Sequence, residues 1–249
     1  MGKIIAISNH KGGVGKTTSA INIGAGLALK GKKVMLIDMD PQANMSQSLG
    51  VHEPETGIYE AMKGIAALQT VKIRKNLFLA PASAGLGGAE LELASEAGRE
   101  FILKELLAPV ENEYDFILID CPPSLGLLTI NAFTAAHEVY IPMQAQFLAL
   151  QGIGNLLGLV DKIKSRLNAG LEITGIFITQ FDRRKVLNRY VMETLESHFG
   201  EKVFKTKIRN NIALAEAPNE GCDIFSYQPS SNGAFDYQQL VKEVLKRNS

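Results

Sequence analysis

The stretch Lys3-Ile-Ile-Ala-Ile-Ser-Asn-His-Lys-Gly-Gly-Val-Gly-Lys-Thr-Thr18 decides how this chain folds. Its first part is an apolar, β-rich run, and its second part is rich in glycine, which predicts a buried strand, a tight turn and the start of a helix. Glycine lets the backbone turn without Cβ clashes, and the N–H groups at a helix start attract an anion. The stretch therefore predicts a loop that wraps phosphate.

The predicted loop carries two lysines and a hydroxyl that suit a nucleotide triphosphate. We expect Lys16 to reach the β and γ phosphates and the Thr17 hydroxyl to ligate Mg²⁺. The pattern G-x-x-x-x-G-K-[ST] is met except that His10 replaces its first glycine, and Lys11 adds a lysine inside the loop. A glycine-rich turn that binds nothing is the alternative, but Gly-Lys-Thr after a strand favours phosphate. The expected nucleotide-binding residues are Lys11, Gly12, Gly13, Val14, Gly15, Lys16, Thr17 and Thr18.

Outward from the loop, short apolar runs alternate with helical segments. Near-continuous apolar strands between helices are typical of an α/β fold, here a doubly wound, mostly parallel sheet with helices on both faces. No linker-like or repeated segment divides residues 1–249, so we expect a single domain. The expected strands are 3–8, 33–38, 76–80, 116–120, 138–142 and 173–179, and the expected helices are 17–30, 89–97, 125–136, 149–166, 186–199 and 237–247.

Acidic residues follow two of the predicted strands. Asp38 and Asp40 come at the end of one apolar run, and Asp120 ends another. The carboxyl ends of the strands converge on the phosphate loop in this fold, so these carboxylates should lie near it. Any one of them alone would be read as a loop-start residue. Together beside a phosphate loop they predict a Mg²⁺-organising site.

The bulk composition excludes several classes of protein. The 249 residues include 26 Lys and Arg and 26 Asp and Glu, so no global charge announces a nucleic-acid or membrane partner. No apolar stretch approaches the roughly 20 residues of a transmembrane helix, and no signal peptide is evident. Cys121 and Cys222 form no disulfide framework. We expect a cytoplasmic protein without a transmembrane segment.

Several motifs together resemble the ParA family of deviant Walker A P-loop ATPases, in particular its short Soj-type members. The matching segments run nearly end to end: Lys11-Gly-Gly-Val-Gly-Lys-Thr-Thr18, Asp38-Met-Asp-Pro-Gln42, Asp120-Cys-Pro-Pro-Ser-Leu-Gly126, Thr129-Ile-Asn-Ala132, Ile141-Pro142 and Leu214-Ala-Glu-Ala-Pro218. The resemblance implies ATP or ADP and Mg²⁺ as cofactors and a slow, Mg²⁺-dependent ATPase. It also implies an ATP-dependent homodimer, because the family brings a signature lysine across the dimer to the partner's ATP.

The resemblance assigns roles to individual residues. Lys11 matches the signature lysine, and Lys16 and Asp40 complete the implied catalytic set, with Asp40 positioning the attacking water. Asp38 is expected among the nucleotide-binding residues. Asp120 is expected to bind Mg²⁺ through a water molecule, and Thr17 is the other metal ligand. Phe181 and Asp182 fall where the family contacts the base.

A basic segment offers a surface for DNA. Residues 183–209 hold eight Lys or Arg against three Glu, which suits nonspecific contacts to phosphates of double-stranded DNA. A solvated helix face is the alternative. The expected DNA contacts are Arg183, Arg184, Lys207 and Arg209, with Arg184 matching an arginine that the family uses. Ala213 stands where the family often has arginine.

These features predict an ATP-hydrolysing switch for chromosome or plasmid partitioning, released from the nucleoid by a ParB/Spo0J-like centromere-binding protein. The alternative is a ParA/MinD-like positioning ATPase that acts on a membrane or protein scaffold. The apolar stripe of the C-terminal helix, 237–247, is the candidate membrane element, and a helix docked on the core is favoured. The chain starts at the first strand, so no N-terminal helix-turn-helix domain is expected.

Overall fold

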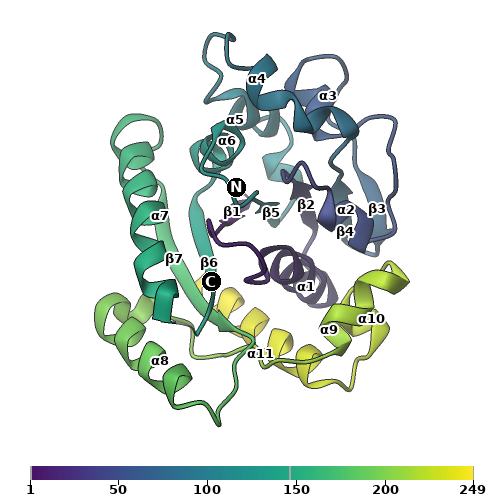
Figure 1. Ribbon diagram of the computed structural model, residues 1–249. Helices are drawn as coiled ribbons and strands as arrows, with labels where there is room; N and C mark the ends of the chain where they lie inside the picture. Colours follow the sequence, from purple (N-terminus) through teal and green to yellow (C-terminus); the bar gives the residue numbers. More distant parts are fainter. Residues whose placement is uncertain (1, 146, 249) are drawn as a thin grey trace.

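The computed structural model describes residues 2–145 and 147–248, and in this part of the chain a seven-stranded sheet forms the centre of the molecule (Figure 1). The strand order is β3-β4-β2-β5-β1-β6-β7, and only the edge strand β3 runs antiparallel to its neighbour. The predicted doubly wound, mostly parallel sheet is confirmed. The strands are β1 (Lys3–Ile7), β2 (Val34–Asp38), β3 (Val71–Arg74), β4 (Leu77–Ala80), β5 (Phe116–Asp120), β6 (Glu138–Gln144) and β7 (Glu172–Thr179).

Helices cover both faces of the sheet, as expected for strands that are apolar on both sides. Along β1, Ile4 and Ala6 join one buried cluster, while Ile5 and Ile7 join another on the opposite face. We propose that the chain is one domain, because both clusters pack on the same sheet. The helices are α1 (Lys16–Leu29), α2 (Asn44–Ser48), α3 (Ile58–Met62), α4 (Ala89–Glu92), α5 (Ile102–Leu107), α6 (Leu127–Ala135), α7 (Phe147–Arg166), α8 (Val186–Phe199), α9 (Ala213–Glu216), α10 (Ile224–Tyr227) and α11 (Asn232–Arg247).

The direction of winding reverses beside β1. Helix α1 carries the chain from β1 to β2 on one face, whereas α6 carries it from β5 across β1 to β6 on the other. Ligands of open α/β sheets bind at the carboxyl ends of the strands where the order reverses. Residues Ile7 and Asp120 are paired in register at this point. The fold therefore brings the glycine-rich loop after β1 beside the acidic end of β5.

Several elements differ from the sequence-based expectation, and the short helices α2, α3, α5, α9 and α10 were not predicted. The edge strand β3 was not predicted; its side chains are exposed or half-buried, so it lacks an apolar period. The predicted helix 89–97 is wrong beyond Glu92, where turns follow α4. Helix α11 begins at Asn232, five residues earlier than expected. Ser231 caps it by accepting a hydrogen bond from the Ala234 amide, and Gly233 fits there because Leu214 packs against it.

Substitution of Gly175, in β7, would test how tightly side chains pack on the face of the sheet that carries α1 and α11. A Cβ added to Gly175 would lie 2.5 Å from Phe204 Cε2 and 2.6 Å from Tyr140 Cδ1, and both rings are fully buried. We expect Gly175→Ala to lower the free energy of unfolding by about 1–3 kcal/mol. Gly158→Ala, on an exposed turn of α7 with open space around it, should instead raise it by about 0.5–1 kcal/mol. Urea denaturation of both variants measures the difference; equal stabilities would contradict this packing.

Candidate functional site

The glycine-rich loop leaves β1 and turns sharply into α1. Gly13 has a φ of 72° and Gly15 a φ of 85°, both in the left-handed region that other residues rarely adopt. The Ser19 amide donates to the Gly15 carbonyl at 2.9 Å, so the first helical turn closes directly onto the loop. The first N–H groups of a helix have no partner within the helix, so the start of α1 beside this loop suits phosphate.

Lys16 lies inside the loop. Its Nζ donates to the Lys11 carbonyl at 3.3 Å, and its side chain is buried. Burial lowers the pKa of Lys16, and the charges of Asp120, Cys121 and Asp40 oppose that effect. A lysine held this way can serve as a local cation for phosphates in the loop, and its contact with the β and γ phosphates stays a prediction.

Asp120, at the end of β5, is fully buried, and neither of its carboxylate oxygens has a hydrogen-bond partner among the described residues. The Thr17 hydroxyl faces this carboxylate without completing a hydrogen bond of normal geometry. Burial, followed by the charge of Asp38, raises the pKa of Asp120 well above its usual range. An unpaired buried carboxylate is costly, so the site calls for a cation or for the donors that a cation's water shell supplies.

The two acidic residues of the β2 end differ in their surroundings. Asp38 accepts hydrogen bonds from the Ser46 amide, the Ser46 hydroxyl and the Asp40 amide, at 2.8, 2.7 and 3.2 Å. Burial nevertheless raises the pKa of Asp38 to about 6. The Asp40 carboxylate accepts from the Gln42 amide and is 7% exposed. Asp38 thus fixes the turn that holds Asp40 at the edge of the site.

The donors present fit Mg²⁺. The Thr17 hydroxyl and the unpartnered Asp120 carboxylate are oxygen groups, which Mg²⁺ prefers, and it commonly takes its remaining ligands from water and from nucleotide phosphates. Within the part of the chain that the structure describes, no group of three or more His, Cys, Asp or Glu is arranged to hold a metal. A phosphate ligand and Mg²⁺ would therefore complete one another's binding here.

A cavity of about 250 Å³ adjoins the start of α1. Its lining includes Gly15 and Thr18, Gln180, the segment 208–211 and Tyr237. Phe181 and Asp182, the residues expected at a base, are not among the lining residues. The Phe181 amide binds the Ile208 carbonyl at 2.9 Å. The base contact of Phe181 and Asp182 stays a prediction, and the cavity adds 208–211, whose Asn-rich sequence carries no motif that could have revealed it.

The expected DNA residues come from two segments that meet in space. Phe181 and Arg209 form a bridge between them, and Lys207 Nζ lies 5.6 Å from the centre of the Phe181 ring. Arg184 forms a two-point ion pair with Asp182, at 3.0 and 2.9 Å, and its hydrogen bonds lower the pKa of Asp182 to about 2. Arg183 is exposed.

Arg209 has a different environment. Its side chain binds the buried Asp236 carboxylate through Nε and Nη2, and its backbone amide binds the same carboxylate. Nearby Ala213, where the family often has arginine, is 1% exposed, whereas its neighbour Ile212 is 75% exposed. Arg209 therefore fixes the 208–211 segment to α11, and position 213 faces the core.

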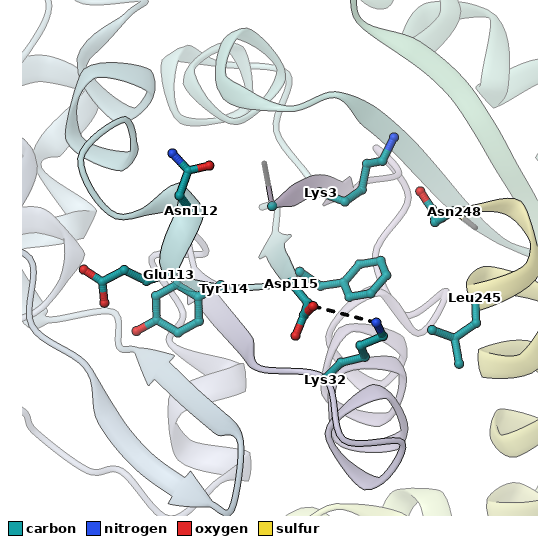
Figure 2. A pocket seen from close by; sticks show the side chains of 10 residues that line it. Lys3, Lys32, Asn112, Glu113, Tyr114, Asp115, Leu245 and Asn248 are labelled. Atoms are coloured by element: carbon teal, nitrogen blue, oxygen red, sulfur yellow. Dashed lines mark ion pairs between the residues drawn. The ribbon is translucent and has the colours of Figure 1, made fainter.

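A larger cavity, about 490 Å³, lies at the opposite, amino-terminal edge of the sheet (Figure 2). Lys32 and Asp115 face each other across it, 3.7 Å apart, and Lys3 and Asn248 lie along its rim. Lys3 is paired with Glu138 at 3.0 Å. The charged residues Lys3 and Lys32 of this cavity are therefore paired with acidic residues of the chain, and the cavity is remote from the loop after β1.

Helix α11 buries its apolar stripe. Leu240, Val241 and Val244 are at most 1% exposed and belong to the core cluster that contains α1. The expectation of a docked helix is confirmed. Among the described residues, no helix has the length and apolar character needed to cross a bilayer.

Comparison with known proteins gives consistent results. The model of a family described as "AAA domain" matches residues 2–173. The chain is 49% identical to the chromosome-partitioning ATPase Soj of Treponema pallidum, covering 100% of this chain and 99% of the relative. It is 46% identical to the sporulation initiation inhibitor protein Soj of Bacillus subtilis, covering 98% of each. Its fold matches that of cobyrinic acid a,c-diamide synthase from Mycobacterium smegmatis with bound ATP analog and magnesium (TM-score 0.86, 33% identity, covering 99% and 95%).

Asp120→Asn tests the unpaired buried carboxylate. Because its folded-state pKa is raised, Asp120 contributes stability only while protonated, and this contribution is lost as pH rises above the ordinary carboxyl range. We therefore expect the asparagine variant, without nucleotide or Mg²⁺, to equal or exceed the parent in free energy of unfolding at pH 8, with a smaller gain at pH 5. Denaturant titrations at both pH values measure it.

Asp223→Asn is the matched control. Asp223 is also buried, but it is paired with Arg74 at 2.8 Å and caps α10. Its loss should lower the free energy of unfolding by about 1–3 kcal/mol. If Asp120→Asn destabilised the protein to the same degree at pH 8, Asp120 would have satisfied partners, and the argument for a cation would be lost.

Proposed function

The chain belongs to the Soj/ParA family of chromosome-partitioning ATPases, and from that premise we propose that its ATP-bound form is a sandwich dimer that holds nonspecific double-stranded DNA. It is an ATPase that uses ATP, ADP and Mg²⁺ and acts in partitioning. The observation that carries the DNA proposal is the meeting of two basic segments, around residues 183–189 and 202–209, beside the nucleotide cavity.

Within one chain, the loop supplies most of the chemistry. The N–H groups of the loop bind the phosphates, Lys16 stabilises charge on the β and γ phosphates, and Thr17 and Asp120 hold Mg²⁺, the latter through water. Bound Mg²⁺ would neutralise developing charge on the phosphate oxygens. Asp40, at the rim of the site, orients the attacking water.

Lys11 explains why two chains would pair. Lys16 already occupies the interior of its own loop, 3.3 Å from the Lys11 carbonyl, so one chain has its cis lysine in place. A Lys11 donated across a dimer would place a second cation at the partner's γ-phosphate, as an arginine finger does. ATP then joins the two copies by mass action, and hydrolysis releases them.

The basic surface would bind DNA through its backbone. Arg184 is held by an exposed ion pair, which water and salt weaken, so a phosphate replaces Asp182 at little cost. Arg209 is committed to buried Asp236. We therefore assign the principal contacts to Arg183, Arg184 and Lys207, and a supporting role to Arg209. Two such surfaces in a dimer raise the affinity through multivalency.

The cycle that follows is a partitioning switch. The ATP dimer would collect on the nucleoid, a ParB/Spo0J-like centromere-binding protein would stimulate hydrolysis, and the released monomers would rebind elsewhere. The rival is a positioning ATPase on a membrane or protein scaffold. The buried stripe of α11 removes the candidate membrane element, which argues against the membrane form of the rival.

Lys11→Ala should separate ATP binding from dimerisation. The variant keeps Lys16 and the loop, so it should bind an ATP analogue within a few-fold of the parent but remain a monomer in sizing chromatography with Mg²⁺. Asp40→Ala is the paired variant. It should bind ATP and dimerise while hydrolysing ATP at least tenfold more slowly. An intact ATP dimer of the Lys11 variant would exclude the trans contact.

Arg183→Ala/Arg184→Ala should weaken retention on nonspecific duplex DNA in the presence of ATP. Each lost phosphate contact lowers the slope of log affinity against log salt by about 0.9. Binding measured at several salt concentrations gives this slope. Arg99→Ala, which removes a half-buried arginine outside both basic segments, is the control. A parent protein retained on anionic vesicles but not on DNA would support the rival.

A further inference from the structure

Two glutamine side chains converge on one carbonyl of the phosphate loop. Gln144 Nε2, from the end of β6, donates to the Gly13 carbonyl at 2.8 Å. Gln180 Nε2, directly after β7, donates to the same oxygen at 3.1 Å. A carbonyl oxygen has two lone pairs and accepts both bonds. These two side chains lie 131 and 167 residues beyond Gly13 in the sequence, and the nucleotide-binding motifs do not include them.

The next carbonyl of the loop is held in the same way. Thr179 Oγ1 donates to the Val14 carbonyl at 2.7 Å and lies 3.3 Å from the Met143 carbonyl. Thr179 is buried, so this bond is shielded from water. Side chains from the ends of β6 and β7 thus fix two consecutive carbonyls of the loop.

The orientation of these carbonyls determines where the loop's donors point. The described chain has no cis peptide bond, and in a trans peptide the C=O and the following N–H point in opposite directions. A Gly13 carbonyl held toward β6 and β7 turns the Val14 N–H away from them, toward the concave side of the loop. The Thr179 bond does the same for the Gly15 N–H. Donors set before the ligand arrives need no reorganisation on binding.

The backbone of Gln180 shows that its position is enforced. Its φ is 51°, in the left-handed region that a non-glycine residue adopts at a cost. Such strain persists where the surroundings fix it, often at functional sites. Gln180 also lines the 250 Å³ cavity next to the loop. One strained residue therefore contacts both the phosphate loop and the adjoining cavity.

We propose that Gln144 and Gln180 are positioning residues for triphosphate binding, which jointly orient the Gly13–Val14 peptide so that its N–H faces the phosphates. The two bonds are redundant, because either glutamine alone still holds the Gly13 carbonyl. Losing both frees the peptide to rotate. The inference concerns ATP binding by a single chain and is independent of the DNA and dimer proposals.

Redundancy predicts a non-additive effect. We expect Gln144→Leu and Gln180→Leu each to raise the Kd for a Mg²⁺-bound nonhydrolysable ATP analogue by less than about threefold, and the double variant to raise it at least about tenfold. Titration calorimetry without DNA gives the three values. Gln239→Leu, on the surface of α11, is the matched control and should bind as the parent does.

The melting temperature of the nucleotide-free protein distinguishes positioning from simple support. The melting temperature should be unchanged in the double variant, because the two lost hydrogen bonds are exposed to water. Their effect is on the direction of the loop N–H groups rather than on the stability of the fold. An additive effect, or no effect, on Kd would overturn the proposal. So would a melting temperature that falls in parallel with affinity, which would make the glutamines structural supports only.

Discussion

The burial of two neighbouring carboxylates on adjacent strands sets the conditions for this site. Asp38 and Asp120 are paired in register on β2 and β5, and both are fully buried. Burial and the charge of Asp38 raise the pKa of Asp120, and the positive charge of Lys16 offsets only part of that effect. Asp38 is satisfied by Ser46 and by the backbone, whereas Asp120 is not. The fold thus keeps one carboxylate as a structural anchor and leaves its neighbour to a cation.

The motifs of this site could be predicted from sequence because they are local. The glycines, Lys16 and Thr17 stand in one turn between a strand and a helix, and their spacing follows from loop geometry. Asp120 was predictable because a carboxylate that ends a buried apolar strand needs a compensating cation or donors, and a phosphate loop with Mg²⁺ provides them. The rule for parallel sheets predicts that the carboxyl ends of the strands converge on the loop, and the observed strand order places Asp120 opposite Ile7.

What the sequence could not predict depends on distant contacts. The segment 208–211 lines the 250 Å³ cavity beside the loop, where Arg209 is tied to Asp236 and the Ile208 carbonyl accepts the Phe181 amide. Nothing in the composition of that segment signals either bond. Strand β3 and the early start of α11 were missed for a related reason: an exposed edge has no apolar period, and the glycine at the start of α11 is required only because Leu214 packs above it.

The same segments join the phosphate loop to the basic surface proposed for DNA. Residues 179–182 begin at the last residue of β7. They contact the loop through Thr179 and Gln180 and end in Asp182, which accepts hydrogen bonds from Arg184. The neighbouring 208–211 segment lines the cavity and is fixed through Arg209. A shift of either segment to accommodate a nucleotide must therefore move residues that carry positive charge at the surface. Coupling between sites requires a shared physical element, and these two adjacent segments supply one within a single subunit.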